Sequence, residues 1–163
     1  MLGMIKLIGA IFIFAASVSV GFSASAMYRV RAEQLEAFGA LITHIGAQIG
    51  GFLAPLDRIY CDFKDARLEK CGFLRVLRSS GASAALGECR ESLFLNDGEI
   101  GELEKFFSSL GRGDANEEER HCAYFAKRFA RFYESARNES ASKGRLFRTF
   151  GFLSGLMLAV ILV

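Results

Sequence analysis

The stretch LIGAIFIFAASVSVGFSASAM, residues Leu7–Met27, contains no charged residue. As an α-helix rising about 1.5 Å per residue it would extend roughly 31 Å, which matches the hydrocarbon thickness of a bilayer. Lys6 precedes this stretch, and Arg29 and Arg31 follow it. We therefore predict an N-terminal transmembrane helix over residues 1–28. The alternative is a cleaved signal peptide, because Ala24-Ser25-Ala26 has the small-x-small form of a cleavage site. Cleavage after Ala26 would leave an extracytoplasmic helical protein anchored by its C-terminal end.

The other end of the sequence carries a second uncharged stretch, Thr149–Val163, which reads TFGFLSGLMLAVILV. It is short for a span, but Arg145 and Arg148 can snorkel toward the headgroups and so lengthen the embedded helix. This predicts a C-terminal transmembrane helix over residues 146–163. Gly151 and Gly155 form a GxxxG pattern, which is typical of close helix packing in membranes.

The cations beside the two stretches predict their orientation. Arg29 and Arg31 follow the first stretch, while Lys143, Arg145 and Arg148 precede the second. The positive-inside rule then places residues 29–145 in the cytoplasm. Because the formal net charge is only +2, no strong field would attract nucleic acid. Acidic lipid headgroups are the expected neighbours of the cations near the C-terminus.

Between the two stretches the hydrophobic period is helical throughout, and no segment alternates with period two. The fold class is therefore predicted to be all-α: a cytoplasmic bundle of about five to six helices over residues 29–145, flanked by the two transmembrane helices. The first bundle helix should continue directly from the first span. Its apolar positions are Leu35, Phe38, Leu41, Ile42, Ile45, Ile49 and Phe52.

Local signals predict where the other helices begin and end. Pro55 suits the first turn of a second helix. A third helix is expected over Ala66–Arg78, with a break at Ser79-Ser80-Gly81, and Ser83 is a candidate N-cap for a fourth. Further along, Asn96 with Glu99 and Asp114 with Glu117 have capping-box spacing, and Gly111 occupies the position of a helix-ending glycine.

Residues that could carry chemistry are scattered. The four cysteines lack the spacing of a metal site, and we expect free thiols. His44 is predicted to be a packed, hydrogen-bonded histidine, and His121 lacks neighbouring zinc donors. We expect Glu117, Glu118 and Glu119 to be solvated carboxylates that complement a helix dipole. The sequence therefore predicts no cofactor, no metal, no catalytic residue and no enzyme activity.

Three segments resemble the stage III sporulation protein AB family. They are MIKLIGAIFIFAAS, LEAFGALITHIGAQIGGFLAPLDRI, and LGRGDANEEERHCAYF leading to RTFGFLSGLMLAVILV. The third is the most specific, because it combines Gly111, Asp114, Glu118 and His121. The resemblance implies a mother-cell membrane protein of a complex that links mother cell and forespore. It also implies a cytoplasmic part similar to the helical domain of type II secretion and type IV pilus platform proteins.

Such platforms dock a cytoplasmic ATPase and organise other membrane subunits. On this resemblance the expected partners are a secretion-type ATPase, other membrane subunits of the same sporulation complex and the lipid bilayer; self-association is left open. The candidate partner-binding residues surround the turn before the last helix: Arg112, Asp114, Glu117, Glu118, Arg120 and His121. Charged turn residues of this kind steer association and set specificity.

Overall fold

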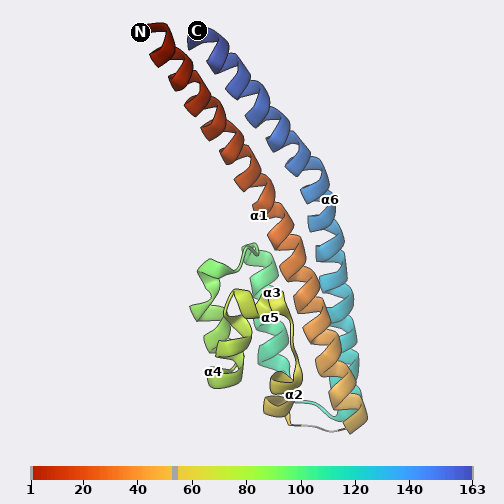
Figure 1. Ribbon diagram of the computed structural model, residues 1–163. Helices are drawn as coiled ribbons and strands as arrows, with labels where there is room; N and C mark the ends of the chain where they lie inside the picture. Colours follow the sequence, from red (N-terminus) through yellow and green to blue (C-terminus); the bar gives the residue numbers. More distant parts are fainter. Residues whose placement is uncertain (1, 53–54, 163) are drawn as a thin grey trace. The chain divides into compact units, whose positions relative to one another are not determined.

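The computed structural model describes residues 2–52 and 55–162, and every regular element in them is helical (Figure 1). This confirms the predicted all-α class. The α-helices are α1 (Leu2–Phe52), α2 (Leu56–Asp62), α3 (Ala66–Lys70), α4 (Phe73–Glu88), α5 (Asp97–Ser109) and α6 (Ala115–Leu162), with a 3₁₀ turn, η1 (Arg90–Ser92). The predicted continuity of the first helix is also confirmed, because α1 runs unbroken from Leu2 to Phe52.

The chain divides into two compact units. Arg31–Ser135 forms the first, which we call the bundle unit, and Met1–Val30 with Ala136–Val163 forms the second, which we call the terminal unit. The long helices α1 and α6 each contribute to both units. The boundaries predicted from the sequence at residues 28 and 145 concern membrane embedding, and they remain predictions.

A chain of aromatic rings joins four helices in the core of the bundle unit. The ring centroids of Phe38 on α1 and Phe73 on α4 lie 4.9 Å apart, and Phe73 lies 6.3 Å from Phe107 on α5. Phe106 on α5 then contacts Phe125 on α6, with centroids 5.4 Å apart. Phe38, Phe73 and Phe106 are completely buried, so their apolar area supplies much of the driving force for folding.

Gly46 lets α1 approach α6 closely within the bundle unit. A Cβ placed on Gly46 would lie 2.8 Å from the Cβ of Cys122, nearer than real Cβ atoms come to each other. A Cβ on Gly39 would meet the Cβ of Phe129 at 3.8 Å, which is ordinary contact. Gly46 is therefore required by the packing. Burial also raises the pKa of the Cys122 thiol to about 11, with the nearby Glu118 adding to the effect.

Helix boundaries between α2 and α4 differ in part from those expected. Pro55 is the N-cap of α2, one position before the predicted first turn. The single helix predicted over Ala66–Arg78 is wrong, because Gly72 adopts φ 82° and separates α3 from α4. The break predicted at Ser79-Ser80-Gly81 is confirmed as a kink at Gly81, whose φ of 84° is left-handed. Ser83 lies inside α4 and does not cap it.

The capping box at the start of α5 is confirmed. The Glu99 backbone N–H donates to Asn96 Oδ1 at 2.8 Å, and the Asn96 N–H donates to Glu99 Oε2 at 2.9 Å. Two further features also agree with the sequence. Gly111 has the left-handed φ of 82° expected after a helix end. All four cysteines are free.

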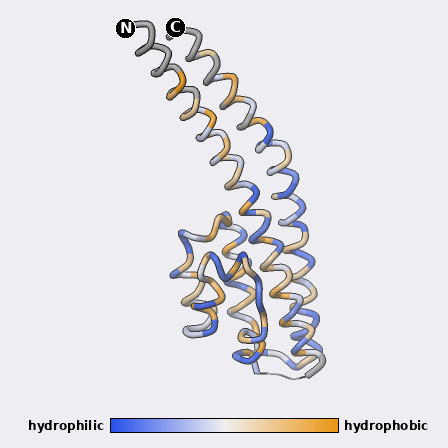
Figure 2. Tube along the Cα trace, in the orientation of Figure 1, coloured by the Kyte–Doolittle hydropathy of each residue, from blue (hydrophilic) through white to orange (hydrophobic). Residues whose placement is uncertain are grey.

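The terminal unit consists of two helical segments that run side by side in opposite directions (Figure 1). They approach closely where a Cβ on Gly144 would lie 2.9 Å from Ser25 Oγ. Large apolar side chains of this unit face solvent; they are Ile11, Phe12, Val20, Phe22, Met27, Leu146, Phe150, Phe152, Leu153 and Met157. Figure 2 shows hydrophobic and hydrophilic residues mixed along the helices of the bundle unit.

Within the described part of the chain, no helix combines the length and the apolar character needed to cross a bilayer. The two transmembrane helices predicted from the sequence are therefore not supported by the structure. The GxxxG glycines Gly151 and Gly155 lie in α6, but their packing, like the side chain of Arg148, lies outside what the structure describes.

Candidate functional site

The turn between α5 and α6 is built around the carboxylate of Glu118. Its Oε1 accepts the backbone N–H groups of Gly111, Arg112 and Gly113 at 3.0, 2.9 and 2.9 Å. Three successive N–H groups that converge on one oxygen form a nest, an arrangement that favours an anion. A residue one turn into α6 thus fixes the conformation of the turn that precedes the helix.

The environment of Glu118 corrects the expectation that it is solvated. Its side chain is only 5% exposed, and Oε2 is buried without a hydrogen-bond partner among the described residues. Burial raises the pKa of this carboxyl. The three backbone N–H donors and His121 outweigh that effect and lower the pKa below the ordinary value. Glu118 is therefore a charged internal support of the turn, while Glu117 and Glu119 are exposed as predicted.

His121 is also turned inward. Its Nε2 lies 2.8 Å from the Ser109 hydroxyl at the end of α5, and its ring stacks on Phe106 with centroids 5.4 Å apart and planes 9° apart. Nδ1 is buried without a partner among the residues that the structure describes. The half-buried His121 side chain, which belongs to α6, thus links α6 to α5 through the Ser109 hydroxyl and the Phe106 ring.

The remaining four candidates are exposed side chains of the same turn: Arg112, Asp114, Glu117 and Arg120. Asp114 caps α6, since its Oδ1 accepts the Glu117 N–H at 2.8 Å. Arg120 Nε donates to the carbonyl of Asn116, one turn back, at 3.2 Å. The turn therefore displays two cations and two anions on a backbone held rigid by Glu118. Such a surface can guide a charged partner, but it holds no nucleophile–base pair.

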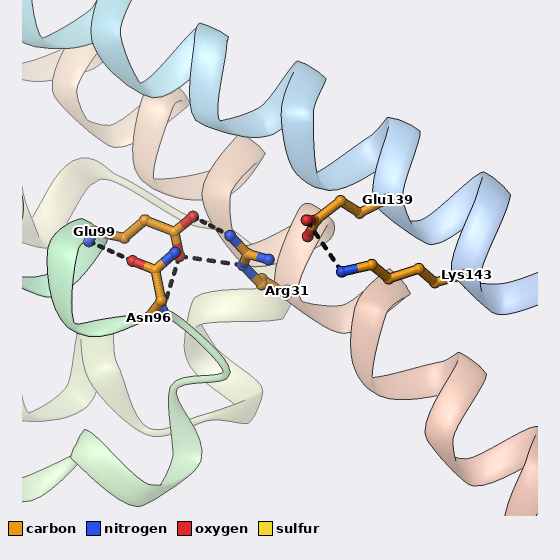
Figure 3. A network of polar contacts seen from close by, with 5 residues as sticks. All are labelled: Arg31, Asn96, Glu99, Glu139 and Lys143. Atoms are coloured by element: carbon orange, nitrogen blue, oxygen red, sulfur yellow. Dashed lines mark hydrogen bonds and ion pairs between the residues drawn. The ribbon is translucent and has the colours of Figure 1, made fainter. Parts of the chain in front are cut away.

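Arg31, predicted to flank a membrane span, is half-buried at the start of the bundle unit and pairs with Glu99, while its membrane-flanking role stays a prediction. Its Nε and Nη2 donate to the two oxygens of Glu99 at 3.2 and 2.7 Å (Figure 3). Glu99 is 2% exposed and also belongs to the capping box with Asn96. The Arg31 guanidinium thus fastens the start of α5 to α1, a role that a bidentate arginine fulfils better than lysine would.

Sequence reasoning missed a second connection from α1, made by Gln34. This side chain is 3% exposed, donates through Nε2 to the Ser92 carbonyl at 3.0 Å, and accepts the Phe94 N–H at 2.8 Å. The loop before α5 is thus held by two side chains one turn apart on α1. The available signal was a polar residue beside Leu35 on the apolar stripe, where a buried amide needs partners.

In the terminal unit the predicted flanking cations are on the surface. Lys143 Nζ lies 3.4 Å from Glu139 Oε1 (Figure 3) and 5.6 Å from the centroid of the Tyr28 ring. Arg29 and Arg145 are exposed. Exposed cations can contact an anionic surface, and their predicted place beside a membrane stays a prediction.

His44 departs from expectation in one respect. Its ring packs against Phe63 with centroids 5.3 Å apart, but its buried Nε2 finds no hydrogen-bond partner among the described residues. The predicted hydrogen bond is thus not seen at this nitrogen. Among the residues that the structure describes, no group of His, Cys, Asp or Glu side chains is arranged to hold a metal ion.

These features define a class: an all-α protein with a packed bundle unit and a charged turn stiffened by a buried carboxylate. The chain belongs to the stage III sporulation protein AB family, whose family model matches residues 6–74 and 79–163. It is 26% identical over 179 positions to stage III sporulation protein AB of Bacillus subtilis (strain 168), an alignment that covers 98% of this chain and 100% of the relative. No solved structure matches the chain. The resemblance found in the sequence is thereby confirmed.

Proposed function

We propose that this protein is a non-enzymatic assembly platform of a sporulation complex, held at the mother-cell membrane by its terminal unit. The observation that carries this proposal is the distribution of apolar side chains. The bundle unit buries most of its large apolar residues in a core and exposes Phe94 and Tyr124, whereas ten large apolar side chains are exposed among the described residues of the terminal unit. Exposed apolar surface on this scale is typical of a lipid or protein contact. Family membership supports a role in sporulation.

In this proposal the bundle unit faces the cytoplasm and presents the turn of Arg112, Asp114, Glu117 and Arg120 to a secretion-type ATPase. The four side chains are exposed, and the nest at Glu118 holds the backbone that carries them. A rigid display lowers the entropy lost on binding, so a small charged surface can discriminate between partners. Other membrane subunits of the complex would contact the terminal unit.

A membrane-flotation experiment tests the location. The full chain, mixed with vesicles made from the lipids of a spore-forming bacterium, should float with them and resist extraction by carbonate.

An intact-mass measurement on the membrane-bound chain addresses the alternative of cleavage after Ala26. A mature protein that begins at Met27 would replace the two-segment anchor by a C-terminal one.

A pull-down of the detergent-solubilised protein with the ATPase of the same complex tests the docking surface. Glu117→Lys combined with Arg120→Glu reverses two exposed charges without changing the net charge, and capture should fall at least tenfold. Glu88→Lys with Arg75→Glu is the matched control, because both residues are exposed on α4. Equal capture by both double variants would remove the turn from the proposal.

A further inference from the structure

The terminal unit contains a pocket of about 450 Å³ between its two helical segments. It is open to solvent on one side, and its walls come mainly from α1, with one residue from α6. The residues that line it are Phe22, Ser23, Ser25, Ala26, Arg29 and Ser140. None of these was proposed as a binding residue on the basis of the sequence, apart from Arg29 as a cation beside a membrane span.

The lining combines one guanidinium, three hydroxyl groups and an apolar wall, and it includes no carboxylate. Ser23 donates its own hydroxyl proton to the Ser19 carbonyl at 3.0 Å, which leaves Ser25 and Ser140 as the hydroxyl donors for a ligand. Arg29 carries five N–H donors, so it can bind an anion while it keeps another partner. A guanidinium beside hydroxyl donors matches the several acceptor oxygens of a phosphate group.

We propose that this pocket binds the headgroup of an acidic phospholipid through a phosphate diester whose charge no choline cation neutralises, with Arg29, Ser25 and Ser140 as its donors. The inference rests on the proposed membrane location of the terminal unit. Two observations favour a lipid over free phosphate. Phe22, which lines the pocket, is 57% exposed, and its α1 neighbours Val20 and Met27 are 69% and 55% exposed. A single exposed arginine binds a soluble anion weakly, whereas apolar contact with acyl chains adds to the affinity.

The test measures binding of the full chain to vesicles of neutral phosphatidylcholine, alone and with phosphatidylglycerol added. The wild type should prefer the vesicles that contain phosphatidylglycerol at least tenfold. Arg29→Gln should lose most of this preference, and Ser140→Ala should reduce it about threefold. Arg137→Gln is the matched control, because Arg137 is an exposed α6 arginine that does not line the pocket. It should change the preference less than twofold, and circular dichroism should confirm that each variant is helical.

The outcomes separate the pocket from the membrane location. If the chain floats equally with both kinds of vesicle, the location stands and the headgroup site is overturned. Equal losses in Arg29→Gln and Arg137→Gln would indicate general electrostatic attraction and would also overturn the site. If millimolar inorganic phosphate protects the chain against heat as well as phosphatidylglycerol does, the ligand is soluble phosphate and not a lipid. A chain that floats with neither kind of vesicle would overturn both proposals.

Discussion

At the scale of single residues, Glu118 makes stability depend on pH in a predictable direction. The pKa of its carboxyl is lowered in the folded state. The stabilisation that the Glu118 charge gives to the fold is therefore complete above the pKa of an unfolded glutamate, about 4.3, and is lost as the pH falls through the lower pKa of the folded state. Glu118→Gln keeps an acceptor oxygen but removes the charge. We expect a loss of about 1–2 kcal/mol in the free energy of unfolding at pH 7, shrinking toward zero at low pH.

Urea denaturation at pH 7 and near pH 3 measures this difference between wild type and variant. Glu104→Gln, at an exposed position on α5, is the control and should change stability by less than about 0.5 kcal/mol at either pH. If Glu118→Gln lowers the free energy of unfolding by the same amount at both pH values, the charge of Glu118 does not act through the nest.

Gly46 provides a second prediction at this scale. Because an added Cβ would lie 2.8 Å from that of Cys122, Gly46→Ala must push α1 and α6 apart. We expect destabilisation of about 1–3 kcal/mol, although alanine favours the helix. Gly101→Ala on α5 is the matched control, since nothing lies within 4 Å of its added Cβ. It should leave stability unchanged or raise it by up to about 1 kcal/mol. Thermal melts of both variants make the comparison.

Residues whose partners are close in sequence were predictable, and residues with distant partners were not. Asn96 and Glu99 are three positions apart, so their spacing alone indicated the capping box. Arg31 and Glu99 are 68 positions apart, and Gln34 is 58 from Ser92. Nothing local distinguishes Arg31 from Arg29 as a membrane-flanking cation, and only the folded chain shows that one of them enters the bundle unit.

At the scale of elements, the start of α5 depends on Glu99 more than on its other groups. Glu99→Gln removes the carboxylate charge that accepts two hydrogen bonds from Arg31 and weakens the capping box, and it should cost about 2–3 kcal/mol because a charge-assisted contact is lost. Asn96→Ala removes only the cap and should cost about 1 kcal/mol. Chemical denaturation monitored by circular dichroism gives both values.

The surface pair Arg90–Asp97 near the same helix start is the comparison for Glu99. Its atoms are 2.5 Å apart, but the Asp97 side chain is 95% exposed. Arg90→Gln should therefore cost less than about 1 kcal/mol, since solvent screens the pair. A cost equal to that of Glu99→Gln would mean that burial does not determine the strength of these ion pairs.

The separation of α3 from α4 shows why helix ends were harder to predict than helices. Leu68, Phe73, Leu74 and Leu77 are all buried, so the apolar spacing of one helix continues across the break. The break itself depends on Gly72, whose left-handed φ costs glycine little. A glycine within a helical pattern is often tolerated, and tertiary packing decides which glycines end a helix.

At the scale of the whole molecule, the sequence indicated correctly where apolar residues concentrate. The uncharged stretches at the two ends correspond to a unit with exposed apolar side chains, and the helical middle corresponds to a unit with a core. Composition alone does not predict which helices these stretches belong to. The structure describes them as parts of α1 and α6, helices that also enter the bundle unit, and this continuity follows from the absence of a helix-ending signal near Val30 or Ala136.

This division predicts that residues 31–135 fold without the rest of the chain. Apart from Ala136, all the buried hydrophobic residues of the described chain lie within this range, so the excised segment keeps its core. We expect a monomeric helical fragment that needs no detergent and unfolds in one cooperative transition, because a core of this size supports two-state behaviour. Shortening the fragment to 39–128 removes Leu35, Phe38 and Phe129 and should abolish cooperativity. If the 31–135 fragment aggregates or melts without a transition while the full chain in detergent melts sharply, the bundle unit depends on the terminal unit for its stability.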